Sequence, residues 1–231
     1  MIHSGTVVVL SVLGAIVGLD FVSFPQAMLS RPLVAATLGG WVSGSATSGL
    51  LVGVLLECFA LETMPFGASR YPEWGPAAVV AGAFAAVPGD AEIVARTLPF
   101  ALLVGLVCAM LGGQTLVWLR QFNLTVAGRY RDDIAAGDAA AVVAVQWTGL
   151  VIDFGRAGAV TAAYALVALP ARDATLDALR ALSAPVSLAV TGAIAVGVGG
   201  GAVWKVVHTT KGYAWYLLAG LLVGAAAAVF A

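Results

Sequence analysis

Residues Arg31–Gly75 read RPLVAATLGGWVSGSATSGLLVGVLLECFALETMPFGASRYPEWG. Two uncharged apolar runs, Pro32–Gly44 and Gly49–Leu56, flank the small-residue turn SATS. A helix of about a dozen residues is about 18 Å long, whereas the hydrocarbon core of a bilayer is about 30 Å thick. Because neither run can cross a membrane alone, we predict a re-entrant helical hairpin.

Charged residues follow this hairpin within the same segment. Glu57 still belongs to the apolar pattern, and Glu62, Arg70 and Glu73 accompany the prolines and glycines of Met64–Gly75. Charge and irregular backbone at membrane depth are tolerated only against protein or a water-filled cavity. The segment therefore predicts a solute site inside the membrane.

The composition is that of an integral membrane protein. The chain has 231 residues, of which 61% are hydrophobic and 10% charged, whereas soluble domains carry about 25% charged residues. Its length suits one multi-pass domain over residues 1–231. A net charge of -1 without a basic run gives no indication of nucleic-acid binding. Cys58 and Cys108 lie in apolar runs, which is typical of small core residues rather than of a disulfide or metal pair.

The N-terminal apolar segment predicts a broken helix. Thr6–Leu19 is apolar, Asp20 interrupts it, and Phe21–Leu29 resumes it with Pro25 and Gln26 inside. A carboxylate, a proline and an amide within one hydrophobic segment indicate a break that faces the protein interior.

The second half predicts further apolar helices. Leu98–Leu119 is long enough to span a bilayer, and the polar stretch Arg120–Asp138 belongs outside the hydrocarbon. Ala139–Leu169 is a second long apolar segment, in which Asp153 and Arg156 share a helix face and could form a pair within the scaffold.

The C-terminal third predicts two more helices. We expect Pro170–Ser183 to be a polar connection lying along the membrane interface, followed by the glycine-rich run Val186–Trp204 and the final run Tyr213–Ala231. Short or broken apolar segments in both halves are typical of inverted-repeat transporters. The predicted fold is an all-α polytopic bundle.

The opening segment also carries a gapless set of residues shared with a known family. The shared residues are Arg31-Pro32-Leu33, Thr37-Leu38, Gly44, Gly49, Gly53, Leu56-Glu57, Ala60-Leu61, Gly67 and Pro72. In these residues the chain resembles the IIC membrane subunit of the mannose/sorbose type of the bacterial phosphoenolpyruvate-dependent sugar phosphotransferase system. Glu62, Arg70 and an extra Phe24-Pro25 depart from the usual pattern and leave the identity of the sugar open.

The resemblance implies a sugar-translocating subunit in the cell (inner) membrane. A IIC subunit pairs with a IID membrane subunit in larger hetero-oligomers and carries sugar inward by an elevator-like movement. Soluble IIA and IIB subunits, which hold the phosphorylated histidines, then pass phosphate to the sugar. The resemblance therefore implies neither a catalytic nucleophile nor a cofactor in this chain, and His3 and His208 are its only histidines.

Six residues are the candidate sugar contacts. They are Glu57, Asp20, Gln26, Glu62, Gly67 and Arg70. A carboxylate accepts hydrogen bonds from sugar hydroxyls and is costly in lipid without such partners.

Each candidate also has a structural interpretation. Glu57 could instead pair with Arg70 or Arg31, and Asp20 with Arg31. Gln26 could satisfy freed backbone groups. Glu62, Arg70 and Glu73 could form an ion-pair network in the loop, and Gly67 could only shape the backbone.

Two other function classes stay open from the sequence. One is a degenerate scaffold subunit that anchors soluble phosphotransferase proteins. The other is a stand-alone carrier driven by an ion gradient, with Asp20 or Glu57 as its proton or cation site. A need for phosphoenolpyruvate during uptake separates the latter from the phosphotransferase hypothesis.

Overall fold

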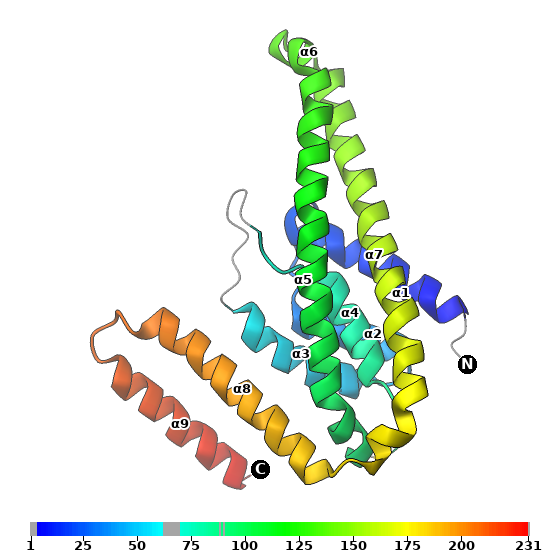
Figure 1. Cartoon of the computed structure of the whole chain (residues 1–231). Coiled ribbons are helices and arrows are strands. Elements are labelled where there is room, and N and C mark those ends of the chain that lie inside the picture. The colour runs from blue at the N-terminus through cyan, green and yellow to red at the C-terminus, as the bar shows by residue number, and fades with distance from the viewer. Residues whose placement is uncertain (1–3, 62–69, 88, 90, 231) are drawn as a thin grey trace.

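The computed structural model describes residues 4–61, 70–87, 89 and 91–230, which form nine helices and contain no strand (Figure 1). The helices are α1 (Ser4–Val22), α2 (Pro32–Val42), α3 (Ala46–Ala60), α4 (Trp74–Ala85), α5 (Ala91–Arg129), α6 (Arg131–Ala135), α7 (Ala139–Ala181), α8 (Ala184–Val207) and α9 (Tyr213–Phe230). The prediction of an all-helical fold is confirmed for this part of the chain.

The predicted hairpin is present as α2 and α3. Pro32 occupies the first turn of α2, where its missing N–H costs nothing. Gly44 adopts a φ of 103° in the turn, and the Ser45 hydroxyl caps α3 by accepting from the amide of Ser48 at 3.3 Å. With 11 and 15 residues, the helices are about 16 and 22 Å long, so neither spans a bilayer core of about 30 Å.

The helix α4 packs antiparallel against α2 with almost no space between the backbones. A Cβ at Gly39 would collide with the carbonyl oxygen of Val79, and a Cβ at Gly82 with that of Ala36. Small residues allow such close contact between apolar helices, where van der Waals packing supplies the stabilisation.

A second close contact joins α1 to α7. Gly14 and Gly18, four residues apart on α1, face Thr161 and Ala157 of α7 with no room for a side chain at either glycine. This G-x-x-x-G spacing is typical of tightly crossing membrane helices. The crossing fixes the C-terminal end of α1 against the middle of α7.

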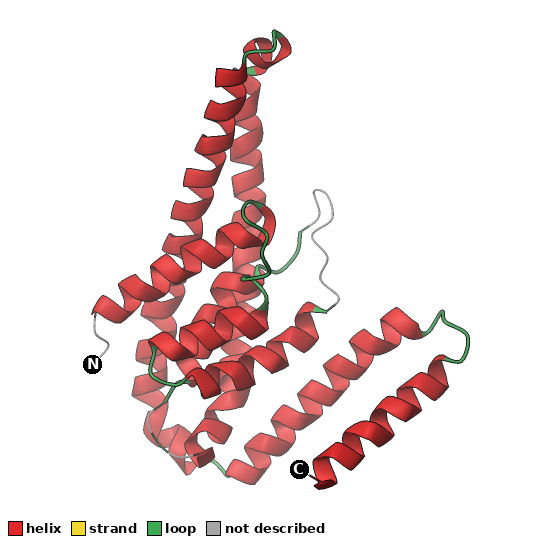
Figure 2. Cartoon of the chain, turned by 180° about the vertical axis from the view of Figure 1, so that it is seen from behind, coloured by secondary structure: helices red, strands yellow, loops and turns green. Residues whose placement is uncertain are grey.

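Figures 1 and 2 show α5 and α7 as a long antiparallel pair that projects beyond the other helices. With 39 and 43 residues, they are about 58 and 65 Å long, roughly twice the thickness of a bilayer core. The charged stretch 120–138 lies at the tip of this pair, as expected for residues outside the hydrocarbon. Among the described residues, α1, α5, α7 and α8 are long and apolar enough to cross a membrane.

The prediction of an interfacial connection over Pro170–Ser183 is wrong. The helix α7 continues through Pro170 to Ala181, because its charged residues have partners that leave the helix intact. Arg172 pairs with Asp173 at 2.7 Å and donates to the carbonyl oxygens of Ala83 at 3.1 Å and of Ala86 at 3.4 Å. Its side chain thus caps the C-terminal end of α4.

Candidate functional site

The predicted break in the first apolar segment lies directly after α1. The helix ends at Val22, and residues 23–30 form an irregular loop in which Gln26 and Met28 adopt φ values of 60° and 65°. Asp20, only 2% exposed, holds this loop by accepting from the amides of Ala27 at 2.6 Å and Ser30 at 2.8 Å. The buried carboxylate therefore replaces the backbone acceptors that the broken helix lacks.

A buried charge network lies behind this loop. The Arg156 guanidinium donates to both carboxylate oxygens of Glu73 at 2.7 and 2.8 Å, and to Asp153 at 2.8 and 3.1 Å. It also donates to the Thr115 hydroxyl at 2.7 Å. The Ser23 hydroxyl donates to the second oxygen of Asp153 at 2.6 Å. The network thereby joins the loop, α5, α7 and the segment before α4.

Two adjacent glycines on α5 make room for the segment before α4. A Cβ at Gly112 would lie 2.7 Å from a carboxylate oxygen of Glu73, and a Cβ at Gly113 would collide with the carbonyl oxygen of Tyr71. The Glu73 amide donates to the carbonyl oxygen of Ala109 on the same helix at 2.9 Å. Backbone packed directly on α5 therefore carries Glu73 to Arg156.

A cavity of about 380 Å³ opens between the loop and α5, and we call it the polar cavity. Its polar groups come from Ser23, Gln26, Tyr71, Arg120 and Asn123, and its apolar wall from Phe21, Val22, Leu116 and Leu119.

The aromatic side of the polar cavity is ordered by ring contacts. Phe21 and Tyr71 meet edge to face at 5.4 Å between centroids, and the Arg120 guanidinium lies 5.2 Å from the centre of the Tyr71 ring. A tyrosine phenol is protonated at neutral pH, so Tyr71 can donate a hydrogen bond into the cavity.

Among the amide groups of the polar cavity, the Asn123 Oδ1 atom is buried and has no hydrogen-bond partner among the described residues. A buried acceptor without a partner destabilises the fold by about 1–3 kcal/mol, so binding of a ligand that donates to it would be favoured. The arrangement offers hydroxyl, amide and aromatic groups to one small polar molecule.

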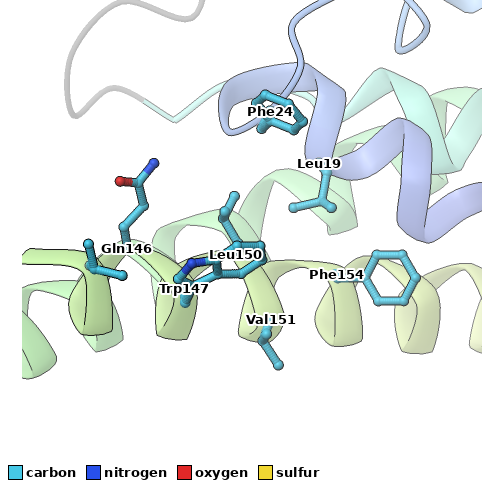
Figure 3. Close-up of a pocket in the computed structure, with 8 residues that line it drawn as sticks. Leu19, Phe24, Gln146, Trp147, Leu150, Val151 and Phe154 are labelled. Carbon is cyan, nitrogen blue, oxygen red and sulfur yellow. The ribbon is translucent and has the colours of Figure 1, made fainter. Parts of the chain in front are cut away.

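A larger cavity of about 610 Å³ lies between Leu19, Phe24 and α7, and we call it the apolar groove. Figure 3 shows Leu19 and Phe24 on one side of it and Trp147, Leu150 and Phe154 of α7 on the other. Gln146 is the polar residue among the eight that line it. Its chemistry suits hydrocarbon rather than a hydroxyl-rich solute.

The sequence from residue 5 to residue 229, nearly the whole chain, matches the family model described as the sorbose-specific IIC component of the phosphotransferase system. The chain belongs to this family. The resemblance drawn from Arg31–Gly75 is therefore confirmed. No curated protein matches this IIC component in sequence.

Two solved structures share the fold of this IIC component. One, described only as "Structure of membrane protein", has a TM-score of 0.68 at 21% identity and covers 100% of this chain and 96% of its own. The other is the cryo-EM structure of the mannose transporter ManYZ in complex with microcin E492. It has a TM-score of 0.56 at 21% identity and covers 100% of this chain and 88% of its own.

The candidate contacts named from the sequence of the IIC component fall in different places. Gln26 lines the polar cavity and donates to the carbonyl oxygen of Val22 at 3.1 Å. Asp20 lies under the loop rather than in the wall of the polar cavity. Arg70 is exposed directly before Tyr71.

Glu57 pairs with Arg31, one of the two arginines considered as its structural partner. The Arg31 Nε atom donates to Glu57 at 2.7 Å, and its terminal nitrogen contacts the same oxygen. The Leu33 amide donates to the other carboxylate oxygen at 3.1 Å. The pair closes the open end of the α2–α3 hairpin. Glu62 and Gly67 lie outside the described residues.

Sequence reasoning missed the partners of the Asp153–Arg156 pair. The spacing predicts the pair itself, which forms at 2.8 Å, but as a contact within the scaffold rather than beside a site. The spacing does not reveal that the pair is buried or that it is linked to Glu73. It also does not reveal the roles of Ser23, Tyr71 and Asn123. The adjacent Gly112 and Gly113 within a spanning helix were the one available signal of a backbone crossing there.

Proposed function

We propose that this chain is the sugar-translocating IIC subunit of a mannose-type phosphotransferase system, with the sugar bound in the polar cavity. The observation that carries the proposal is the cavity itself. A hydroxyl, two amides and two aromatic rings converge on about 380 Å³ at a break in a membrane helix. Small-molecule sites typically combine a small number of convergent polar groups with an apolar wall.

The buried network supports a site that holds its shape. Ser23 on the wall is fixed by Asp153, and Asp153 is fixed by Arg156. Both carboxylates of the network are fully buried, so neither is lost to water. Residues whose rotamers are locked by such partners bind with less ordering cost.

The candidate contacts take different roles in this proposal. Gln26 touches the sugar, and Asp20 positions the loop that carries Ser23 and Gln26. Glu57 stabilises the open end of the hairpin through its ion pair with Arg31. Arg70, next to the wall residue Tyr71, stays a candidate contact, as do Glu62 and Gly67.

The partners follow from the family. We expect a IID subunit beside this chain, soluble IIA and IIB subunits that phosphorylate the incoming sugar, and an elevator-like movement during transport. The similarity to ManYZ, a mannose transporter, supports a hexose as cargo and a two-component membrane complex. An ion-gradient carrier is not favoured, because Asp20 and Glu57 already have hydrogen-bond partners.

The test uses the chain co-expressed with its IID, IIA and IIB subunits in cells that lack their own mannose-type system. We expect sugar uptake that depends on phosphoenolpyruvate, and weaker sugar binding by the purified membrane complex in the Gln26→Ala and Asn123→Ala variants. The exposed Gln121→Ala on α5 serves as the matched control. Uptake in vesicles without phosphoenolpyruvate, or full sugar affinity in both cavity variants, would contradict the proposal.

A further inference from the structure

We infer that Ser23 and Asn123, from the two elements that border the polar cavity, accept hydrogen bonds from hydroxyls of its ligand. The inference rests on the proposed function, since it concerns the same site, and it specifies which atoms of the ligand carry recognition. Three residues in the wall of the polar cavity offer acceptors, and each does so for a different reason.

Ser23 is the first acceptor. A serine hydroxyl has one hydrogen and two lone pairs. Its hydrogen is committed to the Asp153 carboxylate at 2.6 Å, and that carboxylate is in turn bound by Arg156 through its other oxygen. Because the acid is held as an acceptor, Ser23 has only lone pairs left for a ligand.

Asn123 is the second acceptor. Its Oδ1 atom is buried and lacks a partner in the described part of the chain, and the residue lines the same cavity as Ser23. An unsatisfied buried acceptor gains most from a ligand that brings a hydrogen.

Gln26 extends the pattern. One of its N–H groups donates to the Val22 carbonyl at 3.1 Å, which identifies the nitrogen end of the amide and leaves the oxygen end available. The guanidinium of Arg120 lies against the Tyr71 ring, and the amides of Asn123 and Gln26 carry N–H donors besides their oxygens. The Ser23 hydroxyl, whose hydrogen is committed, and the unpaired Asn123 Oδ1 atom are therefore the acceptors that favour a donating ligand hydroxyl.

This polarity makes a chemical prediction. A ligand hydroxyl that only accepts can be replaced by fluorine with partial retention of binding, but a hydroxyl that donates cannot, because fluorine carries no proton. At the positions that face Ser23 and Asn123, replacing the hydroxyl by fluorine or by hydrogen should cost the same. Sites built to bond a hydroxyl reject analogues that leave their polar groups unpaired.

The experiment measures sugar affinity by calorimetry on the purified membrane complex. Sorbose, mannose, fructose and glucose are compared first, and the tightest is followed by its monodeoxy and deoxyfluoro analogues. We expect at least one position where both analogues lose roughly tenfold in affinity, equal within about twofold, as for one lost hydrogen bond. Retained binding of the fluoro analogue wherever the deoxy analogue fails would overturn the inference.

Variants of the protein give an independent arm. Asn123→Asp keeps an acceptor oxygen in place and should bind the sugar within about threefold of wild type, whereas Asn123→Leu should lose roughly tenfold. Ser23→Thr should resemble wild type, and Ser23→Ala should lose affinity. Equal losses in Asn123→Asp and Asn123→Leu would show that Asn123 donates, which overturns the inference.

The two proposals fail in different ways. If sugar binds and both Ser23→Ala and Asn123→Leu leave the affinity unchanged, the polar cavity is not the site and the proposed function loses its location. If these variants weaken binding but the fluoro analogues bind well, the site stands and only its polarity is wrong. Thermal unfolding of each variant separates a lost contact from a lost fold.

Discussion

The polar cavity and the apolar groove are both lined by residues of the same eight-residue loop, yet they have opposite chemistry. Ser23 and Gln26 line the first, and Phe24 between them lines the second. The helix α7 contributes to both regions in different ways. Asp153 and Arg156 belong to the network that fixes Ser23, whereas Trp147 and Phe154 line the groove (Figure 3).

The difference in chemistry comes from the residues that support the wall of each cavity. The polar wall is backed by a fully buried ion-pair network that fixes Ser23. The groove is lined by apolar and aromatic side chains and Gln146, and its Phe24 and Trp147 are 66% and 63% exposed. Buried polar groups need such a network, since isolated polar groups in an apolar environment are costly.

Removing the Arg156 cation should have the largest effect, because it should abolish both the fold of the polar wall and sugar binding. Arg156→Leu leaves Glu73 buried without its cation and Asp153 with only the Ser23 hydroxyl as a partner. Loss of one member of a buried pair costs about 3–5 kcal/mol. We expect the complex to unfold at much lower temperature and to bind no sugar. Thermal unfolding followed by size-exclusion chromatography measures the first effect, and calorimetry the second.

The control is Arg180→Leu, which removes an exposed i,i+3 pair with Asp177 at the far end of α7. Exposed pairs contribute little, so this variant should behave as wild type. Wild-type stability in Arg156→Leu would mean that the network does not support the polar wall.

Adding one methyl group at the backbone crossing should distort only the polar side. Gly113→Ala would press on the Tyr71 carbonyl oxygen, and overpacking of this kind costs about 1–3 kcal/mol. Because Tyr71 lines the polar cavity, we expect sugar affinity to fall together with stability. Gly128→Ala on the same helix meets open space and should change neither. Equal behaviour of the two alanine variants would argue against a tight crossing.

Loosening the loop should affect sugar binding more than folding. Asp20→Ala removes the acceptor of the Ala27 and Ser30 amides, at about 1–3 kcal/mol for groups left unsatisfied. The loop then no longer holds Ser23 and Gln26 in place. Asp20→Asn keeps one acceptor oxygen and should lie between wild type and alanine in a sugar titration. The reverse order would show that Asp20 acts through its charge.

The hairpin and the helix break could be predicted because their signals are local. Pro32, the small-residue turn and the length of each run lead to α2 and α3, and Asp20 with Pro25 leads to the broken end of α1. The extent of α7 could not be predicted, because the charges after Pro170 find partners on α4, far away in sequence.

The candidate site was predicted only in part for the same reason. Gln26 was named from its place in the break, and it lines the polar cavity. Nothing in the sequence marks Ser23, Tyr71 and Asn123 as neighbours. They line one cavity only because residues 70–73 pack across α5. An isolated carboxylate such as Glu57 looks identical in sequence whether it meets a sugar or Arg31.

Variants of Glu57 therefore test whether the open end of the α2–α3 hairpin contributes to sugar binding. Both members of its pair are partly exposed, at 22% for Glu57 and 36% for Arg31, so the pair contributes modestly. We expect Glu57→Gln to lower the melting temperature slightly and to leave sugar affinity unchanged within about twofold, since no cavity contact is lost. Arg31→Gln should match it, and the double variant should add little. A large loss of sugar affinity in Glu57→Gln alone would return Glu57 to the site.

The smallest effect is expected on the apolar side. Trp147→Ala removes a large exposed side chain from the groove but no hydrogen bond to the polar wall, and hydrocarbon from the bilayer can fill the space it leaves. Sugar affinity should therefore change by less than about twofold, well below the roughly tenfold cost of a lost bond. Phe24→Ala is the stricter version, because Phe24 follows Ser23 directly in the chain. If Phe24→Ala weakens binding while Trp147→Ala does not, the loop transmits the change. If both abolish binding, the groove and the polar cavity are parts of one site, and the separation that the loop makes between them is not functional.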